Sequence, residues 1–371
     1  MHQEPSGVRI MAYTTIDDPS AHFQTTLYTG NGSDGYSITN SGNSDLQPDM
    51  LWFKNRNSTQ GHEIFDSTRG VAASLRPHNT DAENVDSPND RLMSFDSDGF
   101  ELDDDGNPNT NNNTYVCWQW KANGGSTTTN DASATGVGNQ DSVYQANTTA
   151  GFSIVTWTGD SSVGTNAHGL GAVPHVIIVK CRSTNGERWE VYHHKNTSAP
   201  ETDHLGLSET DATVDSAHTW NDTAPTSTIF TVGNSGAMNE NNKTYIAYLF
   251  SEKQGYSKFG GYTGNNNADG AFNYTGFKPA FIIIKCTSTA STDWVMYDNK
   301  RDINPVGSDS GTLYPNLGNG DSSAGGIDFL SNGFKSRSTK GYHNGSIRTY
   351  IYMAFAESPL VSSTGIPATA R

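Results

Sequence analysis

One turn of this sequence concentrates the oxygen-bearing side chains that a hard cation needs. The run Asp103-Asp104-Asp105-Gly106-Asn107 leads into an Asn-rich loop. Carboxylate and amide oxygens in a turn are the ligands that Ca²⁺ takes, so Asp103, Asp105 and Asn107 form a candidate calcium site. An EF-hand loop would close with a Glu at its twelfth position, and this run lacks it. The alternative interpretation is a solvated hairpin tip with no cofactor.

Two polar loops carry an aromatic side chain beside amide and carboxylate groups, as loop-borne carbohydrate sites often do. Trp220 lies in the polar segment 217–222, and Tyr342 and His343 precede Asn344. Trp220, Tyr342 and His343 are therefore candidate ligand-binding residues, and a glycan is the class that they suggest. The interpretation that we favour is that each aromatic ring is a lid over its own sandwich.

No residue pattern for catalysis stands out. The sequence offers no recognisable carboxylate pair framing an aromatic cleft, no Ser-His-Asp set and no metal spacing. Scattered acids such as Glu187, Glu190 and Glu209 leave a glycan hydrolase open, because sandwich folds do host such enzymes. We therefore predict a protein that is not an enzyme, with a polysaccharide depolymerase as an alternative.

Three lysines each stand six positions after a proline, at the end of an apolar run: Lys54, Lys180 and Lys285. We expect each lysine to end a buried strand and to pair with a carboxylate on a neighbouring strand. Asp66 and Asp298 are the expected partners of the first and third lysines. His193 replaces the carboxylate in the second case, which makes a ligand or pH role at His193 a minor alternative.

These lysines belong to a skeleton that occurs three times. Each copy opens with a Tyr/Trp-Thr-Gly triplet and closes with a strand that begins at a tyrosine. The triplets end at Gly30, Gly159 and Gly264, and the closing strands begin at Tyr115, Tyr245 and Tyr350. The separations from glycine to tyrosine are 85, 86 and 86 residues, so three copies of one domain are predicted. Function peculiar to one copy should lie where that copy departs from the others.

The apolar runs are short, rich in β-branched and aromatic residues, and bounded by Gly, Pro, Asn or Asp, which is typical of strands. We predict an all-β protein of three tandem β-sandwiches, jelly-roll or lectin-like, each of about 105 residues. The runs at 50–53, 176–179 and 281–284 are apolar on both faces and should be central strands. The predicted segments are an N-terminal segment at 1–21, a first repeat at 22–122, a flexible polar linker at 123–149, a second repeat at 150–253, a third at 254–359 and a tail at 360–371.

Charge and composition limit the partners. Hydrophobic residues make up 33% and charged residues 17% of the chain, and the formal net charge is −16. Nucleic acid and anionic membranes both require a basic footprint, so neither is expected as a partner. No run approaches the ~20 apolar residues that a membrane-spanning helix needs, and no secretory signal is recognisable. The three cysteines show no metal spacing, and we expect reduced, structural thiols.

The first residues read poorly as structure, whereas Met11-Ala12-Tyr13 reads well as a protein start. We expect Met11 rather than Met1 to be the native start. The segment 11–23 precedes the first repeat, and we expect it to be a docking tether.

Three segments resemble a repeat family of tail-fibre-like virion proteins from marine bacteriophages, of the cyanophage or pelagiphage kind. They are the opening at 11–18 with Leu27-Tyr28-Thr29-Gly30, the segment 47–56, and the close at 350–357. The resemblance implies a virion surface protein and carries no catalytic or ligand residues. An acidic β protein without export signal or disulfide framework fits a virion component that folds in the host cytoplasm and leaves by lysis.

The resulting expectation is a tail fibre or adhesin that attaches to a host glycan or receptor and assembles with other virion proteins. We expect it to be a homo-oligomer, and a trimer in particular. Its competitor of another class is a capsid decoration or cement protein. The enzymatic competitor is the depolymerase.

Overall fold

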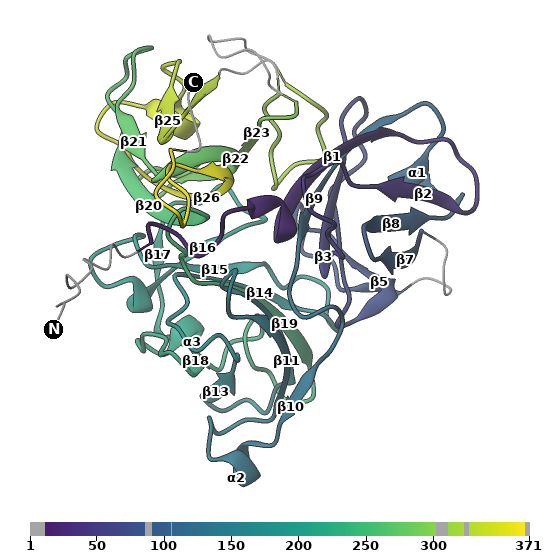
Figure 1. Cartoon of the computed structure of the whole chain (residues 1–371). Coiled ribbons are helices and arrows are strands. Elements are labelled where there is room, and N and C mark those ends of the chain that lie inside the picture. Colours follow the sequence, from purple (N-terminus) through teal and green to yellow (C-terminus); the bar gives the residue numbers. More distant parts are fainter. Residues whose placement is uncertain (1–11, 86–90, 105, 302–310, 323–325, 368–371) are drawn as a thin grey trace, which may run out of the picture.

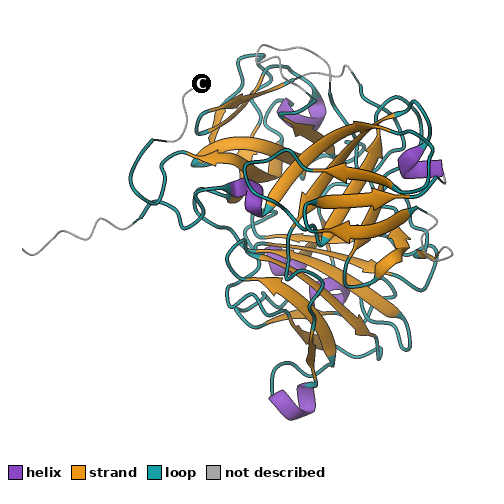
Figure 2. Cartoon of the chain, turned by 45° about the vertical axis from the view of Figure 1, so that its right-hand side comes forward, coloured by secondary structure: helices purple, strands orange, loops and turns teal. Residues whose placement is uncertain are grey.

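The computed structural model describes residues 12–85, 91–104, 106–301, 311–322 and 326–367. Within these ranges the protein is almost entirely β, in several antiparallel sheets, as predicted. Figure 1 shows three lobes around a common centre, with the chain running from the purple lobe through the teal lobe to the yellow-green lobe. Figure 2 shows that strands build all three lobes and that the helices are single short turns. Each lobe holds one copy of the skeleton, called a repeat below.

The first repeat pairs a sheet of order β1-β9-β3-β4-β5-β6 with a smaller sheet of order β2-β8-β7. Its elements are η1 (Pro19–Ala21), β1 (Phe23–Thr29), β2 (Tyr36–Thr39), β3 (Met50–Asn55), β4 (Glu63–Asp66), β5 (Gly70–Leu75), β6 (Asn84–Val85), β7 (Leu92–Asp96), β8 (Gly99–Leu102), α1 (Gly106–Asn109) and β9 (Thr114–Trp120).

The second repeat pairs a sheet of order β10-β11-β12-β19-β14-β15-β16-β17 with the pair β13-β18. Its elements are β10 (Thr128–Asn130), α2 (Ala132–Thr135), β11 (Ser142–Asn147), β12 (Phe152–Thr158), β13 (Gly164–Ala167), β14 (Val176–Cys181), β15 (Glu190–His193), η2 (Pro200–Thr202), β16 (Asp203–Gly206), β17 (Val214–Asp215), α3 (Ala217–Trp220), β18 (Ile229–Val232) and β19 (Thr244–Phe250).

The third repeat pairs a sheet of order β20-β26-β22-β23 with a sheet of order β21-β25-β24. Its elements are β20 (Ser257–Thr263), β21 (Phe272–Tyr274), β22 (Phe277–Cys286), β23 (Val295–Asp298), β24 (Ile327–Leu330), β25 (Gly333–Ser336), α4 (Gly341–Asn344) and β26 (Thr349–Pro359).

A stacked aromatic pair explains why the triplet and the closing tyrosine recur. The two residues are register partners on adjacent strands, and their rings stack at 5.1, 5.3 and 5.0 Å between centroids in the three repeats: Tyr28 on Tyr115, Trp157 on Tyr245, and Tyr262 on Tyr350. In the third repeat the Tyr350 hydroxyl donates to Gly341 O and accepts from Gly345 N, both at 2.7 Å. The pair therefore ties the strands to the capping turn of each sandwich.

The strands β3, β14 and β22 are buried on both faces, as predicted, because they separate two cores. One face packs inside its own sandwich, and the other packs into a central core shared by all three repeats. Three aromatic rings meet at the centre of this core, at 5.6 to 6.4 Å between ring centroids: Trp120, Phe250 and Phe355. Trp120 and Phe250 are the last residues of β9 and β19, and Phe355 occupies the equivalent position in β26. We call these three residues the aromatic triangle. The expectation of independent modules in series is therefore wrong, because the repeats close around a common centre.

The same kind of hydrogen bond occurs at each of the three interfaces between repeats, which we call joints. A ring nitrogen before or at the start of β4, β15 and β23 meets a backbone carbonyl of a neighbouring repeat: Trp189 Nε1 with Arg76 at 3.1 Å, Trp294 Nε1 with Gly206 at 2.8 Å, and His62 Nε2 with Tyr314 at 3.0 Å. The second repeat thus donates to the first, the third to the second, and the first to the third. Trp189 and Trp294 are both buried, and their indole nitrogens form two of these three contacts.

A second contact explains the exception at His193. Carboxylates at the end of β4 and β23 accept from the neighbouring closing strand: Asp66 from Tyr248 Oη at 2.8 Å, and Asp298 from Trp118 Nε1 at 3.0 Å. Met353 occupies the equivalent position in β26 and has no donor to offer. His193 replaces the carboxylate there, and its Nε2 lies 3.1 Å from Tyr352 O. Burial lowers the pKa of His193 to about 3, so the His193 contact carries no charge, while Lys258 Nζ and Glu252 Oε2 form an ion pair at 2.8 Å across the same joint.

Ion pairs also cross the joints that the first repeat makes with the second and the third. Glu83 Oε2 lies 2.8 Å from both Arg69 Nη1 and Arg182 Nε, joining the first and second repeats. Asp321 contacts Arg301 Nη1 and Arg56 Nε at 2.8 and 2.9 Å, joining the third and first repeats.

The segment 123–149, predicted as a flexible linker, is part of the second sandwich. Its strand β11 pairs with β12 along six residues, and β10 pairs with β11. The strand-forming residues Val143 and Tyr144 stand in a segment whose Gly, Ser, Thr and Asn composition is typical of loops. The prediction of a flexible or surface-hugging connector is therefore wrong for β10 and β11.

The N-terminal segment that the sequence suggested as a tether packs onto the third repeat. Ile16 is buried in the central core, and Thr14 Oγ1 donates to Gln254 O at 2.8 Å. The Asp17 carboxylate accepts from Ser363 N at 2.6 Å, so the segment also meets the tail. Residues 1–11, and with them the expected start at Met11, lie outside the described residues.

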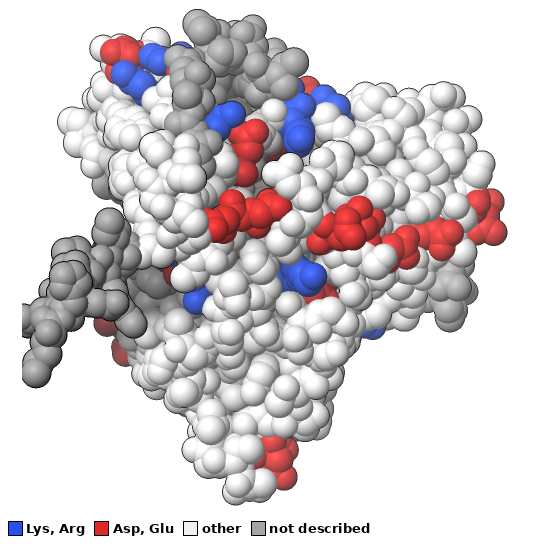
Figure 3. Space-filling view, viewed as in Figure 1, with Lys and Arg blue, Asp and Glu red and all other residues white. Residues whose placement is uncertain are grey.

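Figure 3 shows acidic side chains in a band across one face of the molecule, with large areas carrying no charge. Cys117, Cys181 and Cys286 are buried and free in the strands of their own repeats. Within the described ranges, no helix has the length and apolar character needed to span a membrane.

Candidate functional site

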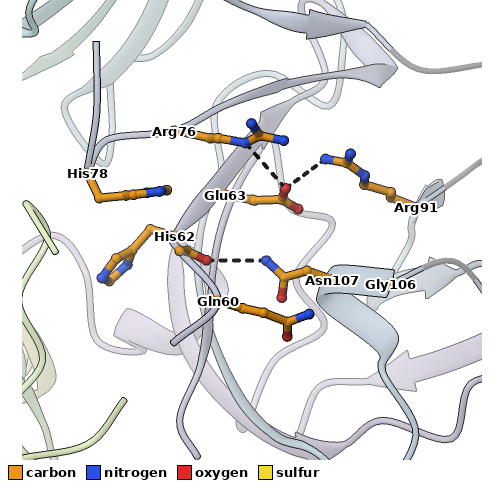
Figure 4. Close-up of a pocket in the computed structure, with 9 residues that line it drawn as sticks. Gln60, His62, Glu63, Arg76, His78, Arg91, Gly106 and Asn107 are labelled. Carbon is orange, nitrogen blue, oxygen red and sulfur yellow. Dashed lines mark hydrogen bonds and ion pairs between the residues drawn. The ribbon is translucent and has the colours of Figure 1, made fainter. Parts of the chain in front are cut away.

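The first repeat has a polar pocket of about 360 Å³ beside the start of β4. Its lining residues come from the loop before β4, the end of β5, the start of β7 and the turn α1. They are Gln60, Gly61, His62, Glu63, Arg76, His78, Arg91, Gly106 and Asn107. We call this the first pocket. Figure 4 shows the side chains of Glu63, Arg76 and Arg91 on one side and Gln60 and Asn107 on the other, with the two histidines at one end.

Glu63 is the charged anchor of the first pocket. Its Oε1 lies 2.7 Å from Arg91 Nη1 and 3.8 Å from Arg76 Nε. Arg76 also lies 3.8 Å from Asp81 Oδ2. Both distances from Arg76 are too long for hydrogen bonds, and its side chain is 32% exposed. The guanidinium of Arg76 therefore keeps donor capacity for a ligand.

Two polar atoms in the first pocket have no hydrogen-bond partner in the described part of the chain: His78 Nδ1 and Asn107 Oδ1. The Asn107 side chain is held by its Nδ2, which donates to Gly61 O at 3.2 Å. Buried polar atoms normally have partners, and an exception calls for water or a ligand. These two atoms are therefore acceptors that a ligand of the first pocket could use.

The histidines of the first pocket are neutral at physiological pH. Burial, followed by the charge of Arg76, lowers the pKa of His78 to about 4. Burial, followed by the charge of Lys54, lowers the pKa of His62 well below its usual value. His62 Nδ1 accepts from Trp52 Nε1 at 2.9 Å, so its Nε2 carries the proton that meets Tyr314 O. Both ring nitrogens of His62 are therefore occupied, whereas Nδ1 of His78 has no partner among the described residues.

The second repeat has a pocket at the equivalent place, of about 460 Å³, which we call the second pocket. Glu190 begins β15 as Glu63 begins β4, and Gly236 corresponds to Gly106. Glu187, Glu190 and Glu209, which the sequence left scattered, all line it. The third repeat has Val295 at the carboxylate position, and there Tyr342 packs on Tyr314 at 6.1 Å between ring centroids.

The aromatic residues predicted to bind a ligand mostly do not face solvent. Trp220 is 2% exposed, and its Nε1 donates to Asp203 O at 3.1 Å. His343 is fully buried between Ser336 Oγ at 2.9 Å and Ser338 Oγ at 3.3 Å, and burial lowers its pKa to about 3. Neither Trp220 nor His343 offers an exposed ring face to a ligand, which fits the favoured interpretation of these residues as lids. Tyr342 is half-buried against Tyr314 and His343.

The residues predicted to bind calcium do not converge on one point where they are described. Asp103 Oδ1 accepts from Asp104 N at 2.6 Å, and Asn107 points into the first pocket. Asp105 lies outside the described residues. In the described ranges no three or more His, Cys, Asp or Glu side chains are grouped as a metal site would require. Calcium binding stays a prediction.

The expected pairing of the three lysines with carboxylates is wrong. Lys54 Nζ donates to the carbonyls of Asn55, Gln60 and Gly318, Lys180 Nζ to those of Thr80 and Glu187, and Lys285 Nζ to that of Thr292. Asp66 and Asp298 instead pair with the arginines three residues on, at 2.6 Å. A nearby arginine offers a carboxylate two donors in fixed geometry, which a lysine cannot match. Burial lowers the pKa of all three lysines to about 8.

Sequence reasoning missed most of the first pocket and named Asn107 for a different role. A signal was present, because the position of Glu63 holds Glu190 and Val295 in the other copies, and the position of His62 holds tryptophans. Aligning the three copies column by column beyond the skeleton would have identified the first repeat as divergent here.

The fold and its pockets define a closed, all-β protein of three sandwich repeats with polar surface pockets. Residues 18–359 match a family described as a domain of unknown function, DUF7483, and the chain belongs to this family. No curated protein matches the chain.

Proposed function

We propose that this protein is a contact protein of a virion surface, a tail fibre or adhesin, that binds a host glycan in the first pocket. The observation that carries the glycan is the pair of unpartnered atoms, His78 Nδ1 and Asn107 Oδ1, beside the partly exposed guanidinium of Arg76. A sugar ring offers hydroxyls that donate to the two acceptors and an oxygen that accepts from the guanidinium. A small pocket that combines charged side chains, neutral histidines and amide side chains is typical of sites that orient a polar ligand.

The virion location is supported by the resemblance of the three sequence segments and by the acidic, disulfide-free composition. Assembly with other virion proteins and trimer formation belong to the same proposal. Native mass spectrometry of the purified chain measures the oligomeric state. Immunogold labelling of the particle, or a density map of it, locates the chain.

The test of glycan binding uses the full chain on an array of bacterial surface glycans, followed by calorimetry on the best ligand. His78→Ala and Asn107→Ala each remove one acceptor, and each should weaken binding about tenfold, the worth of one hydrogen bond in a ligand site. His218→Ala is the matched control, because His218 is exposed in the second repeat, outside both pockets. Binding that survives both pocket substitutions unchanged contradicts the proposal.

A decoration or cement protein of the capsid is the competing proposal, and copy number separates the two. A fibre is present in tens of copies per particle and a decoration protein in hundreds, which quantitative mass spectrometry of purified particles distinguishes.

The depolymerase is the second candidate because Glu187, Glu190 and Glu209 line one pocket. Burial, opposed by Arg188, raises the pKa of Glu190 to about 7, which suits a general acid. Release of reducing sugar from host polysaccharide, abolished by Glu190→Gln, would favour the enzyme over the adhesin.

A further inference from the structure

The second pocket differs from the first in charge. Four carboxylates line it, from Glu187, Glu190, Glu209 and Asp211, and Arg188 is the one basic side chain among its described lining residues. The first pocket has one carboxylate and two arginines at the same place in the fold. The two pockets therefore favour ligands of opposite charge.

Glu190 supplies an acceptor that the protein itself does not use. Its side chain is 3% exposed, and Oε1 accepts from Arg188 Nε at 2.7 Å. Its Oε2 has no hydrogen-bond partner in the described part of the chain. A buried carboxylate oxygen without a donor is costly, so a donor from outside would be strongly favoured.

A histidine nitrogen close to Glu190 Oε2 is occupied in another bond. His204 Nε2 lies 3.6 Å away and meets Arg188 Nη2 at 2.6 Å. Since the guanidinium can only donate, His204 Nε2 accepts and its Nδ1–H donates to Thr219 Oγ1 at 3.1 Å. Burial, followed by the charge of Arg188, lowers the pKa of His204 to about 4, so this histidine stays neutral. It therefore gives Glu190 Oε2 neither a proton nor a positive charge.

The rest of the lining indicates what kind of cation fits. A metal ion requires several ligands at one point, and the described residues hold no such group of three or more His, Cys, Asp or Glu. Hydroxyl side chains of Thr80, Ser216 and Ser235 line the pocket beside the carboxylates. Hydroxyls and carboxylates together suit an organic ammonium whose body also carries hydroxyls.

We propose that the second pocket binds a saccharide with a free amino group, with the ammonium at Glu190 and the outer carboxylates Glu187, Glu209 and Asp211 around it. This inference rests on the proposed function only for the class of ligand, and it uses a different pocket. One chain would then recognise two features of a host glycan through two equivalent sites of opposite charge.

The test measures calorimetric binding of the full chain to a tetramer of β-1,4-linked glucosamine and to its fully N-acetylated form. The amino form should bind at least about tenfold more tightly, because acetylation removes the charge and its ionic hydrogen bond. Glu190→Gln and Glu209→Gln should each weaken binding of the amino form by a similar factor. Glu240→Gln, at an exposed glutamate of the same repeat outside the pocket, is the control.

Equal binding of the two tetramers, or affinities unchanged in both pocket variants, would overturn the proposal. If Glu190→Gln does not fold, Glu209→Gln decides, because Glu209 is partly exposed. Equally tight binding of a simple amine, such as spermidine, would overturn the saccharide as the ligand class. His78→Ala should leave binding of the amino tetramer unchanged, and a loss there would assign it to the first pocket. If His78→Ala loses binding to the glycan array but still binds the amino tetramer, the two pockets bind their ligands independently, as proposed.

Discussion

The hydroxyl of Tyr248 in the second repeat donates to the buried carboxylate of Asp66 in the first at 2.8 Å, across the joint between them. Asp66 is held in place by Arg69 at 2.6 Å, and the Tyr248 ring belongs to the central core. The hydrogen bond therefore connects the ionic joint to the shared core.

Tyr248→Phe should lower the free energy of unfolding by about 1.5–3 kcal/mol, the worth of a hydrogen bond to a charged group. Urea denaturation at pH 7.5 measures the loss. Tyr144→Phe, in the second repeat, is the matched control, because its hydroxyl makes no hydrogen bond to the described residues, and it should change stability little. Equal effects of the two substitutions would show that the contact does not stabilise the joint.

The uncharged His193 contact between the second and third repeats should be convertible to the carboxylate contact seen between the first and second. His193→Asp alone places an unsatisfied carboxylate beside Met353 and should destabilise by several kcal/mol. Adding Met353→Tyr supplies the donor that Tyr248 supplies elsewhere. A double-mutant cycle should give a favourable coupling of about 0.5–3 kcal/mol. Additive losses would indicate that the two positions do not interact.

The aromatic triangle should make the three repeats unfold together. Phe355→Ala removes the ring that meets Trp120 and Phe250 and should cost about 3–5 kcal/mol. Hydrogen exchange should report the loss in all three repeats. Phe334→Ala, in the separate sandwich core of the third repeat, should act most strongly within that repeat. A protease-resistant single repeat would contradict a shared core.

Glu190 should make stability fall as pH rises. Its folded pKa of about 7 is above the unfolded value near 4.5, so its contribution is fully present below pH 4.5 and is lost as pH rises through 7. Glu190→Gln removes this dependence, so the variant should gain up to roughly 3 kcal/mol on the native protein between pH 4.5 and pH 8. Urea midpoints across this range test it, and a constant difference would exclude the raised pKa.

The sequence predicted the repeats, the sandwich class and the doubly buried central strands because each depends on local pattern and spacing. The aromatic pair of Tyr28 and Tyr115 recurs in each repeat because the two residues are direct partners in the pairing of β1 with β9. The common centre was not predictable. Apolar residues such as Trp118 and Phe281 indicate that the outer face of each sheet is buried, but they do not indicate which other surface covers that face. The lysine partners failed for a similar reason, because backbone carbonyls of Gln60 and Gly318 leave no trace in residue types.

The candidate site was only partly foreseeable. Trp220 was misjudged because a polar neighbourhood in sequence does not imply a polar neighbourhood in space, and its ring lies on Tyr192 instead. Glu187, Glu190 and Glu209 were noted as acids, but their meeting in one pocket depends on how β15 and β16 pair. Such convergence needs the tertiary fold.

The contact between Asp17 and Ser363 means that the chain enters and leaves its structure at one place. Because Leu360 N also donates to Gly276 O at 3.3 Å, the first and last described segments are held together on the third repeat. The path of the described chain through the three lobes is therefore a closed circuit, in which each end braces the other.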